Sequence, residues 1–246
     1  MKRAFSERVR RSRCLSSTND EAKKTEIGDR DIILAARQSG GKGRHGRSFL
    51  SDEGGLYASF CYEVRFSPER LILVTGMCAL AAKRATEKVC GISPEIKWTN
   101  DLIFRDKKIC GVLCETVFDG EKPPKLIIGI GINANQEDFP AELSEIASSV
   151  YRLTGKRTDL DTLLRALAEE TDAVIAALEA GDCSEYIEGY RESCSTLGKP
   201  VTVNPLDGSD PYEATATDID EQFGLIIRTP SGERETLRGG EVSVRY

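Results

Sequence analysis

The sequence predicts an α/β (α+β) fold in which a larger domain of strands and helices, residues 1–196, precedes a small β-barrel, residues 197–246. In the larger part, apolar runs of strand length are interleaved with two long segments of helical periodicity. From Leu197 onward the pattern changes to short β-like runs separated by Gly, Pro and Asp turns. No internal repeat is visible, which argues against a solenoid.

Composition narrows the class of protein. The chain has 246 residues, of which 39% are hydrophobic, and it lacks a run of the roughly 18 apolar residues that a membrane span requires. Its 34 basic and 40 acidic residues give a net charge of -6, so no global field attracts nucleic acid or anionic lipid. Any site for a polyanion must therefore be local, and we expect neither a DNA nor a membrane partner.

Cysteine usage indicates a reducing compartment. Eight cysteines without an apolar signal segment are typical of reduced thiols in the cytoplasm. Only Cys110 and Cys114 are closely spaced, and the single His45 is distant in sequence, so we expect packing residues and no metal ligands. The basic first thirteen residues contain Glu7, which favours a solvated first strand over a transit peptide.

The first elements follow from caps and apolar runs. Residues Ser17 to Lys24 are expected to form a short helix, because two residues at its start have capping-box spacing to an acidic residue. Asp31 to Ala36 is a run of strand length. Arg37 to Ser51, rich in Gly and basic residues, is predicted to be a loop, and Gly55 to Val64 a strand.

The middle of the chain predicts a long helix and a meander. Ser67 and Pro68 resemble the N-cap and first position of a helix that ends before Gly91. Three strands are then expected, at Glu95 to Phe104 with an irregular centre, Lys108 to Phe118, and Lys125 to Ile132.

The last part of the chain predicts two helices and five strands. An amphipathic helix runs from Asp159 to about Ala180 and is stopped by Gly181, and Cys183 to Cys194 forms another helical segment. The strands of the expected barrel are Val201 to Pro205, Tyr212 to Asp220, Phe223 to Thr229, Glu233 to Leu237 and Glu241 to Tyr246.

A basic glycine loop, Gly40 to Arg47, is the first candidate site. Residues 41–46 match the dinucleotide fingerprint G-x-G-x-x-G, but the residues that follow lack the helical periodicity which that site requires. Glycines let backbone N–H groups approach an anion, while Lys42, Arg44 and Arg47 supply charge, so the loop suits a phosphate or carboxylate. The alternative is a solvated basic loop.

Three further segments favour a ligand site. Residues 97–101, Lys-Trp-Thr-Asn-Asp, combine a cation with an Asn-Asp pair that suits a nucleotide's phosphates and metal, although a structural turn is the alternative. Lys108 begins an apolar strand in which Gly111 allows close approach to the backbone. Gly129 and Gly131 alternate in the next strand, which costs stability unless something approaches closely.

The Ser-Thr-Asn turn at residues 17–19 and the segments above occur in the order seen in the biotin protein ligase family. The chain resembles that family over nearly its whole length. The family shows Gly-Arg-Gly-Arg-x-Gly-Arg, Lys-Trp-Pro-Asn-Asp, Lys-x-x-Gly-Ile-Leu-x-Glu and Gly-Ile-Gly-Ile-Asn, all with counterparts here in the same order. The resemblance implies a class II aminoacyl-tRNA synthetase-like catalytic domain of mixed sheet and an SH3-like barrel. It implies the short form, without the N-terminal DNA-binding domain, because the turn begins only at residue 17.

The resemblance also implies site residues. Lys108 and Arg44 would be catalytic. The biotin-binding residues would be Ser17, Thr18, Asn19, Gln38, Lys42, Gly43, Arg44, Lys108, Gly111 and Leu113. The ATP-binding residues would be Phe49, Asn100, Asp101, Gly129, Gly131, Ile132, Asn133, Glu241 and Arg245.

The implied reaction joins biotin, as substrate, to ATP with Mg²⁺ to form biotinyl-5'-AMP, and transfers biotin to a lysine of a biotin carboxyl carrier protein or domain. Pairing of two chains into a homodimer is left open. The alternatives are lipoate ligation and a noncatalytic nucleotide or nucleic-acid binding module that uses the basic loop. The acidic net charge counts against the binding module.

Three residues depart from the family pattern. Lys42 stands where arginine is common and keeps the charge without the bidentate fork, and Phe49 stands where tryptophan is usual. Thr99 replaces the usual proline, which is expected to loosen the turn before Asn100 without removing a ligand group.

Overall fold

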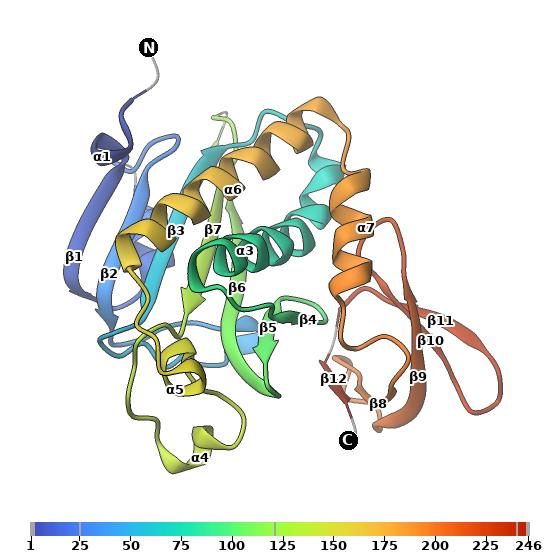
Figure 1. The fold of residues 1–246 in the computed structure, drawn as a ribbon. Helices are drawn as coiled ribbons and strands as arrows, with labels where there is room; N and C mark the ends of the chain where they lie inside the picture. Colours follow the sequence, from blue (N-terminus) through green and yellow to red (C-terminus); the bar gives the residue numbers. More distant parts are fainter. Residues whose placement is uncertain (1–2, 25, 121, 240, 245–246) are drawn as a thin grey trace.

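The computed structural model describes residues 3–24, 26–120, 122–239 and 241–244, which form a larger helix-covered sheet and a smaller C-terminal sheet (Figure 1). The first elements are α1 (Phe5–Arg8), β1 (Val9–Leu15), α2 (Thr18–Ala22), β2 (Ile32–Gln38), the 3-10 turn η1 (Arg44–Gly46) and β3 (Leu56–Glu63). They confirm the predicted short helix, the two strands and the glycine-rich loop between them.

The middle of the chain supplies the remaining strands of the larger sheet. Its elements are η2 (Pro68–Leu73), α3 (Val74–Cys90), β4 (Glu95–Lys97), β5 (Asp101–Phe104), β6 (Lys107–Val117) and β7 (Lys125–Ile132). The helices α4 (Ala141–Ser144), α5 (Val150–Thr154), α6 (Leu160–Ala180) and α7 (Ser184–Ser193) follow. The C-terminal strands are β8 (Pro200–Asn204), β9 (Tyr212–Ile219), β10 (Leu225–Arg228), β11 (Arg234–Leu237) and β12 (Glu241–Val244).

The larger sheet is mixed, as predicted. Its strand order is β1-β2-β3-β7-β6-β5-β4, with β1 and β2 parallel and the other neighbours antiparallel. Strands β4 to β7 form the expected meander. The prediction of one strand over residues 95–104 is wrong, because the chain reverses at residues 98–100 and β4 pairs antiparallel with β5. The peptide bond between Trp98 and Thr99 in this turn is cis.

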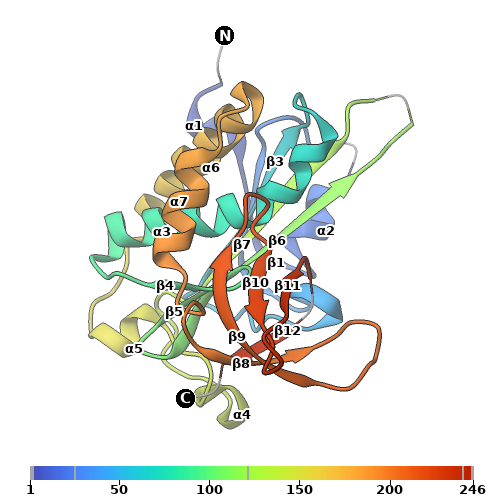
Figure 2. The same ribbon diagram turned by 90° about the vertical axis from the view of Figure 1, so that its right-hand side faces the viewer.

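The main core lies between one face of this sheet and the helices α3 and α6 (Figures 1 and 2). Side chains alternate between the two faces of a strand, so Ile128, Ile130 and Ile132 of β7 all enter this core. Gly129 and Gly131 consequently lie on the opposite face. That face carries α2, which contacts β2, β3 and β7.

Helix ends are only partly as predicted. The glycines Gly91 and Gly181 adopt the left-handed conformation that ends α3 and α6, and the Asp159 side chain accepts hydrogen bonds from the first turn of α6. Ser67 makes no capping hydrogen bond, and the segment from Pro68 is a 3-10 helix before α3 begins at Val74. Among the described helices, none is both long and apolar enough to cross a membrane.

The C-terminal strands form an antiparallel sheet in the order β11-β10-β9-β8-β12, which confirms the change of pattern at Leu197. Its closure into a barrel stays a prediction. Phe223 joins this sheet to the larger one, because its carbonyl accepts a hydrogen bond of 2.8 Å from the indole of Trp98. The Phe223 ring also packs edge-on against Tyr190 of α7, at 5.0 Å between centroids.

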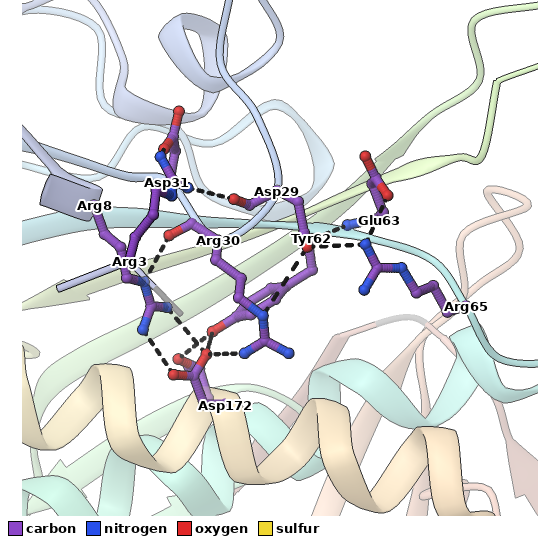
Figure 3. A network of polar contacts seen from close by, with 10 residues as sticks. Arg3, Arg8, Asp29, Arg30, Asp31, Tyr62, Glu63, Arg65 and Asp172 are labelled. Carbon is purple, nitrogen blue, oxygen red and sulfur yellow. Dashed lines mark hydrogen bonds and ion pairs between the residues drawn. The ribbon is translucent and has the colours of Figure 1, made fainter. Parts of the chain in front are cut away.

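A polar network fastens the N-terminal strands to α6 (Figure 3). Asp172 of α6 accepts bonds of 2.7 and 3.0 Å from Arg8, one of 3.0 Å from Arg30 and one of 2.9 Å from Tyr62. Burial raises the pKa of Tyr62 well above its ordinary value, so the phenol stays a neutral donor. The expected solvated first strand is thus only partly right: α1 precedes β1, and Arg8 is buried.

Replacement of this shared acceptor is expected to destabilise the fold. Asp172→Ala leaves Arg8 buried without its carboxylate, which should lower the free energy of unfolding by about 2–4 kcal/mol in urea denaturation. Asp161→Ala is the matched control, because its ion pair with Arg11 is more than half exposed on both sides and should contribute less than about 1 kcal/mol. Equal losses in the two variants would contradict this account of the network.

Candidate functional site

A pocket lies on the sheet face opposite the main core, and paired strands build its floor. Cross-strand partners share a face, so Asp101 of β5, Gly111 of β6, Gly131 of β7 and Tyr57 of β3 form one row across four strands. All four residues line the pocket. The glycines leave the centre of this row without side chains.

The next row receives the helix α2. It consists of Ser59, Gly129 and Leu113, and Asn19 lies over its centre. The Asn19 amide accepts a bond of 2.6 Å from Ser59 Oγ and donates to the carbonyl of Leu113 at 3.2 Å and to Glu115 at 2.8 Å. A Cβ at Gly129 would lie 2.2 Å from Asn19 Oδ1. The glycine is therefore required for the close approach of a protein side chain.

The start of α2 meets the end of β2 at one end of the pocket. Ser17 caps the helix by accepting from the backbone N–H of Asp20 at 3.5 Å. The backbone N–H of Thr18 donates to Gln38 Oε1 at 2.7 Å, and Gln38 Nε2 donates to Ser51 Oγ at 2.8 Å. These contacts hold an array of buried or half-buried hydroxyl and amide groups, which suits a polar, uncharged ligand group.

The glycine loop covers the pocket and is fastened at two places. Lys42 Nζ lies 2.7 Å from the Asp20 carboxylate, and this hydrogen bond holds the pKa of that carboxyl below its ordinary value. Arg44 Nη1 donates to Thr99 Oγ1 at 2.7 Å and to Asn100 Oδ1 at 3.1 Å. Lys42 and Arg44 therefore point back towards the protein, and both line the pocket.

Phe49 follows the loop and lies over the glycine floor. A Cβ at Gly131 would lie 2.7 Å from its ring, and one at Gly111 would lie 3.2 Å away. Lys108 Nζ stands 5.7 Å from the centre of this ring and 2.7 Å from Asp101 Oδ1. The Lys108 ammonium thus pairs with Asp101 and lies at a favourable cation–π distance from the Phe49 ring.

The pocket is locally basic in an acidic protein. Its described lining contains the cations Lys42, Arg44, Arg47, Lys97 and Lys108, against one carboxylate, Asp101. Such clustering inside a cleft favours an anionic ligand. The geometry therefore favours the local phosphate or carboxylate site that the basic glycine loop predicts.

The structure brings most of the predicted site residues together. The pocket is lined by Ser17, Thr18, Asn19, Gln38, Lys42, Gly43, Arg44, Phe49, Asn100, Asp101, Lys108, Gly111, Leu113, Gly129 and Gly131. Ile132 does not contribute its side chain, because strand alternation turns it into the main core, where it is fully buried. Asn133 is buried beside Gln136 and is not among the lining residues.

The C-terminal candidates are only partly described. Glu241 pairs with Asn204 through its backbone, but its side chain and all of Arg245 lie outside the described residues. Val242 of β12 lines the pocket, so the C-terminal sheet reaches the site.

Sequence reasoning missed several lining residues. They include Ser48, Tyr57 and Val242. His45, Lys97 and Trp98 also line the pocket, and they lie within the loop and the segment 97–101 that the sequence singled out, although no role was assigned to them individually. Tyr57 shares a face of β3 with Ser59, but the predicted strand Gly55 to Val64 carries no signal that tells which of its faces lines the pocket. Val242 carries no local signal, because its place depends on how the C-terminal sheet packs.

Two family models match this chain. The biotin/lipoate A/B protein ligase family matches residues 11–133, and the biotin protein ligase C terminal domain matches residues 196–245. These ranges contain the pocket-lining elements α2 to β7 and the C-terminal sheet.

The relatives and solved structures that resemble this chain are also named as ligases. The bifunctional ligase/repressor BirA of Bacillus subtilis is 35% identical over 52% of this chain, and the chain spans only 40% of that relative. The biotin–acetyl-CoA-carboxylase ligase of Paracoccus denitrificans is 26% identical over 92% of this chain and 96% of its own length. The structure of the biotin protein ligase from Aquifex aeolicus in complex with biotin and ATP is 29% identical, with a TM-score of 0.84 over 96% of this chain and 98% of that one.

The two glycine rows should respond differently to a methyl group. Gly129→Ala displaces an amide held by three hydrogen bonds, so the free energy of unfolding should fall by about 1–3 kcal/mol. Gly111→Ala is the control, because its nearest atoms are the movable ends of Phe49 and Lys108 at 3.2–3.4 Å, and its cost should stay below about 1 kcal/mol. Chemical denaturation measures both, and a smaller loss at Gly129 would overturn the role given to Asn19.

Proposed function

The chain belongs to the biotin/lipoate A/B protein ligase family, and from that premise we propose that it is a biotin protein ligase. It activates biotin with ATP and transfers it to a lysine of a biotin carboxyl carrier protein or domain. The proposal is supported by the match of both parts of the chain and by the likeness to the Aquifex aeolicus ligase. The observation that carries it is one pocket that joins a polar, uncharged end to a cluster of cations.

The polar end is assigned to biotin. Its ureido ring offers both hydrogen-bond donors and an acceptor, and the hydroxyls of Ser17 and Thr18 with the amides of Asn19 and Gln38 are groups of matching chemistry. Because these groups already bond to one another, they are oriented before a ligand arrives. The carboxylate of biotin would then extend towards Lys42, Gly43, Arg44 and Lys108, with Gly111 and Leu113 beneath the ligand.

The cationic end is assigned to the reaction. The biotin carboxylate attacks the α-phosphate of ATP, the acyl–phosphate bond forms, and pyrophosphate leaves. Lys108 and Arg44 neutralise two anions that repel each other and the charge that develops on the phosphorus-bound oxygens. The acceptor lysine, as a free amine, then attacks the acyl carbon, so that an amide forms, a proton is released and AMP leaves. No nucleophile of the enzyme is required.

The nucleotide is assigned to the row of β5, β6 and β7. Phe49, Asn100, Asp101 and Gly131 line this part of the pocket. We extend the nucleotide site to Gly129 of the neighbouring row, to Asn133 and to the C-terminal Glu241 and Arg245. For Ile132, only backbone contact is proposed, since its side chain is in the core.

Magnesium is proposed to enter with the nucleotide. Asp101 Oδ1 is buried and receives no hydrogen bond of ordinary geometry from the described residues, although Lys108 Nζ is 2.7 Å away. This carboxylate and the Asn100 amide are hard oxygen ligands of the kind Mg²⁺ prefers, and the ion would neutralise phosphate charge there. Among the described residues, no group of three or more His, Cys, Asp or Glu could hold a metal ion. We propose that phosphate oxygens supply the remaining ligands.

Several finer assignments belong to the same proposal. We assign residues 1–196 to a class II aminoacyl-tRNA synthetase-like catalytic domain and residues 197–246 to an SH3-like barrel. We place the enzyme in the cytoplasm, without a DNA partner, and leave pairing into a homodimer to a measurement of mass in solution.

Covalent labelling tests the function. The protein is incubated with labelled biotin, ATP and a biotin carboxyl carrier domain, with an acceptor-lysine→Arg carrier as the matched control. Label on the wild-type carrier alone supports biotin ligation. Transfer of lipoate in place of biotin would identify a lipoate ligase, and ligand binding without label would identify a noncatalytic binding module.

Loss of the loop arginine should release the intermediate. Arg44→Gly removes the contacts to Thr99 and Asn100 that fasten the loop, so biotinyl-adenylate should escape before transfer. We expect free adenylate and nonspecific biotinylation of bystander proteins to rise by at least about tenfold. Release at the wild-type level would exclude the lid role of Arg44.

Loss of the Lys108 charge should slow the formation of biotinyl-adenylate and should not increase its release, unlike the loss of Arg44. Lys108→Gln keeps a hydrogen-bond donor but removes the charge, so adenylate formation should slow about 100-fold without added release. Pyrophosphate production measures the first step, and hydroxylamine trapping measures the released adenylate. Lys107→Gln is the neighbouring control, because Lys107 donates to the carbonyls of Ser144 and Glu145, outside the pocket.

A further inference from the structure

We propose that Thr99 is the positioning residue for Arg44, and that its hydroxyl fastens the glycine loop over the pocket. The family motif has proline at this position, and proline has no side-chain acceptor. The sequence predicts only a looser turn from this replacement. The structure instead gives the threonine a contact with a pocket-lining cation. The consequence for catalysis rests on the proposed function, whereas the contact itself does not.

The hydrogen-bond geometry favours Thr99 as the principal acceptor. Arg44 Nη1 lies 2.7 Å from Thr99 Oγ1 and 3.1 Å from Asn100 Oδ1, so the shorter bond goes to the hydroxyl. A guanidinium donor makes such a bond charge-assisted and stronger than a bond between neutral groups. The contact spans 55 residues of sequence and joins a glycine-rich loop to the turn between β4 and β5.

The turn that carries Thr99 is held from three sides. The carbonyl of Thr99 accepts from the hydroxyl of Tyr190 in α7 at 2.9 Å. The Trp98 indole donates to Phe223 at 2.8 Å, and the Asn100 amide donates to the carbonyl of Val112 in β6 at 2.8 Å. The acceptor is therefore part of a rigid frame, so a loop bonded to it loses mobility.

The chemistry of the acceptors separates Arg44 from Lys42. Lys42 lies against the carboxylate of Asp20, which also pairs with Lys23 and offsets part of the charge of Lys42. Thr99 Oγ1 and Asn100 Oδ1 are neutral oxygens, so their bonds orient the guanidinium without cancelling its charge. A cation that is held in place yet still charged is what an adenylate phosphate requires.

Limited trypsin digestion tests the fastening without any assumption about the reaction. Trypsin cuts after the basic residues of the loop, and Thr99→Val removes the hydroxyl while it keeps the shape of the side chain. We expect cleavage at Arg44 and Arg47 to accelerate about fivefold, whereas Thr99→Ser should be cleaved at the wild-type rate. Thr202→Val is the matched control, since Thr202 is a half-buried threonine outside the pocket.

Release of biotinyl-adenylate tests the consequence. Thr99→Val should raise the fraction of biotinyl-adenylate that is released about fivefold, whereas Thr99→Ser should stay at the wild-type level. Thr99→Val should add nothing in an Arg44→Gly background, because the partner of the hydroxyl is already gone. If Thr99→Val unfolds at a lower temperature, Thr99→Ala and Thr99→Ser are compared in its place.

The outcomes are distinct. Wild-type trypsin cleavage of the folded valine or alanine variant overturns the proposal, as does full additivity with Arg44→Gly. A wild-type protein that forms no adenylate overturns the proposed function, while the trypsin result still decides whether Thr99 holds the loop. Faster trypsin cleavage of Thr99→Val, together with wild-type cleavage of Thr99→Ser, supports the proposal that Thr99 holds the loop.

Discussion

The site depends on the absence of side chains at the centre of one sheet face. Glycine in a strand costs roughly 0.5–1 kcal/mol relative to alanine, and β7 has two of them. Their space is taken by Asn19 and by Phe49. The isoleucines that alternate with the glycines bury their side chains under α3 and α6 and offset this cost. One strand thus supplies the core on one face and the floor of the pocket on the other.

The two faces are coupled through the segment between β1 and β2. Helix α2 lies in this segment and carries the polar end of the pocket, so its position depends on how both strands are held. Asp172 holds them from the far face by bonding to Arg8 before β1 and to Arg30 before β2 (Figure 3). The residues of this network do not line the pocket, yet they help to fix where Thr18 and Asn19 lie.

Much of this arrangement could be predicted from the sequence, because periodicity and caps are local signals. These signals predict most of the strands and the helix that begins after Asp159. The order of the motifs can be read directly from the sequence. The reversal between β4 and β5 could not be predicted, since a strand of three residues is too short to show alternation. The burial of Arg8 was equally hidden, because its partner Asp172 lies 164 residues away. The inward side chain of Ile132 could have been read from the alternation with Gly131, which the motif match obscured.

The glycine loop shows why a motif predicts residue types better than roles. In sequence, Lys42 and Arg44 are equivalent cations that flank one glycine. In the fold, Lys42 meets a carboxylate that offsets part of its charge, and Arg44 meets neutral oxygens that leave its charge available. The difference arises from α2 and from the turn before β5, segments on either side of the loop in sequence that the sheet brings together around it. The role of each loop residue is therefore set by its acceptor, and Thr99, where the family motif has proline, is one of those acceptors.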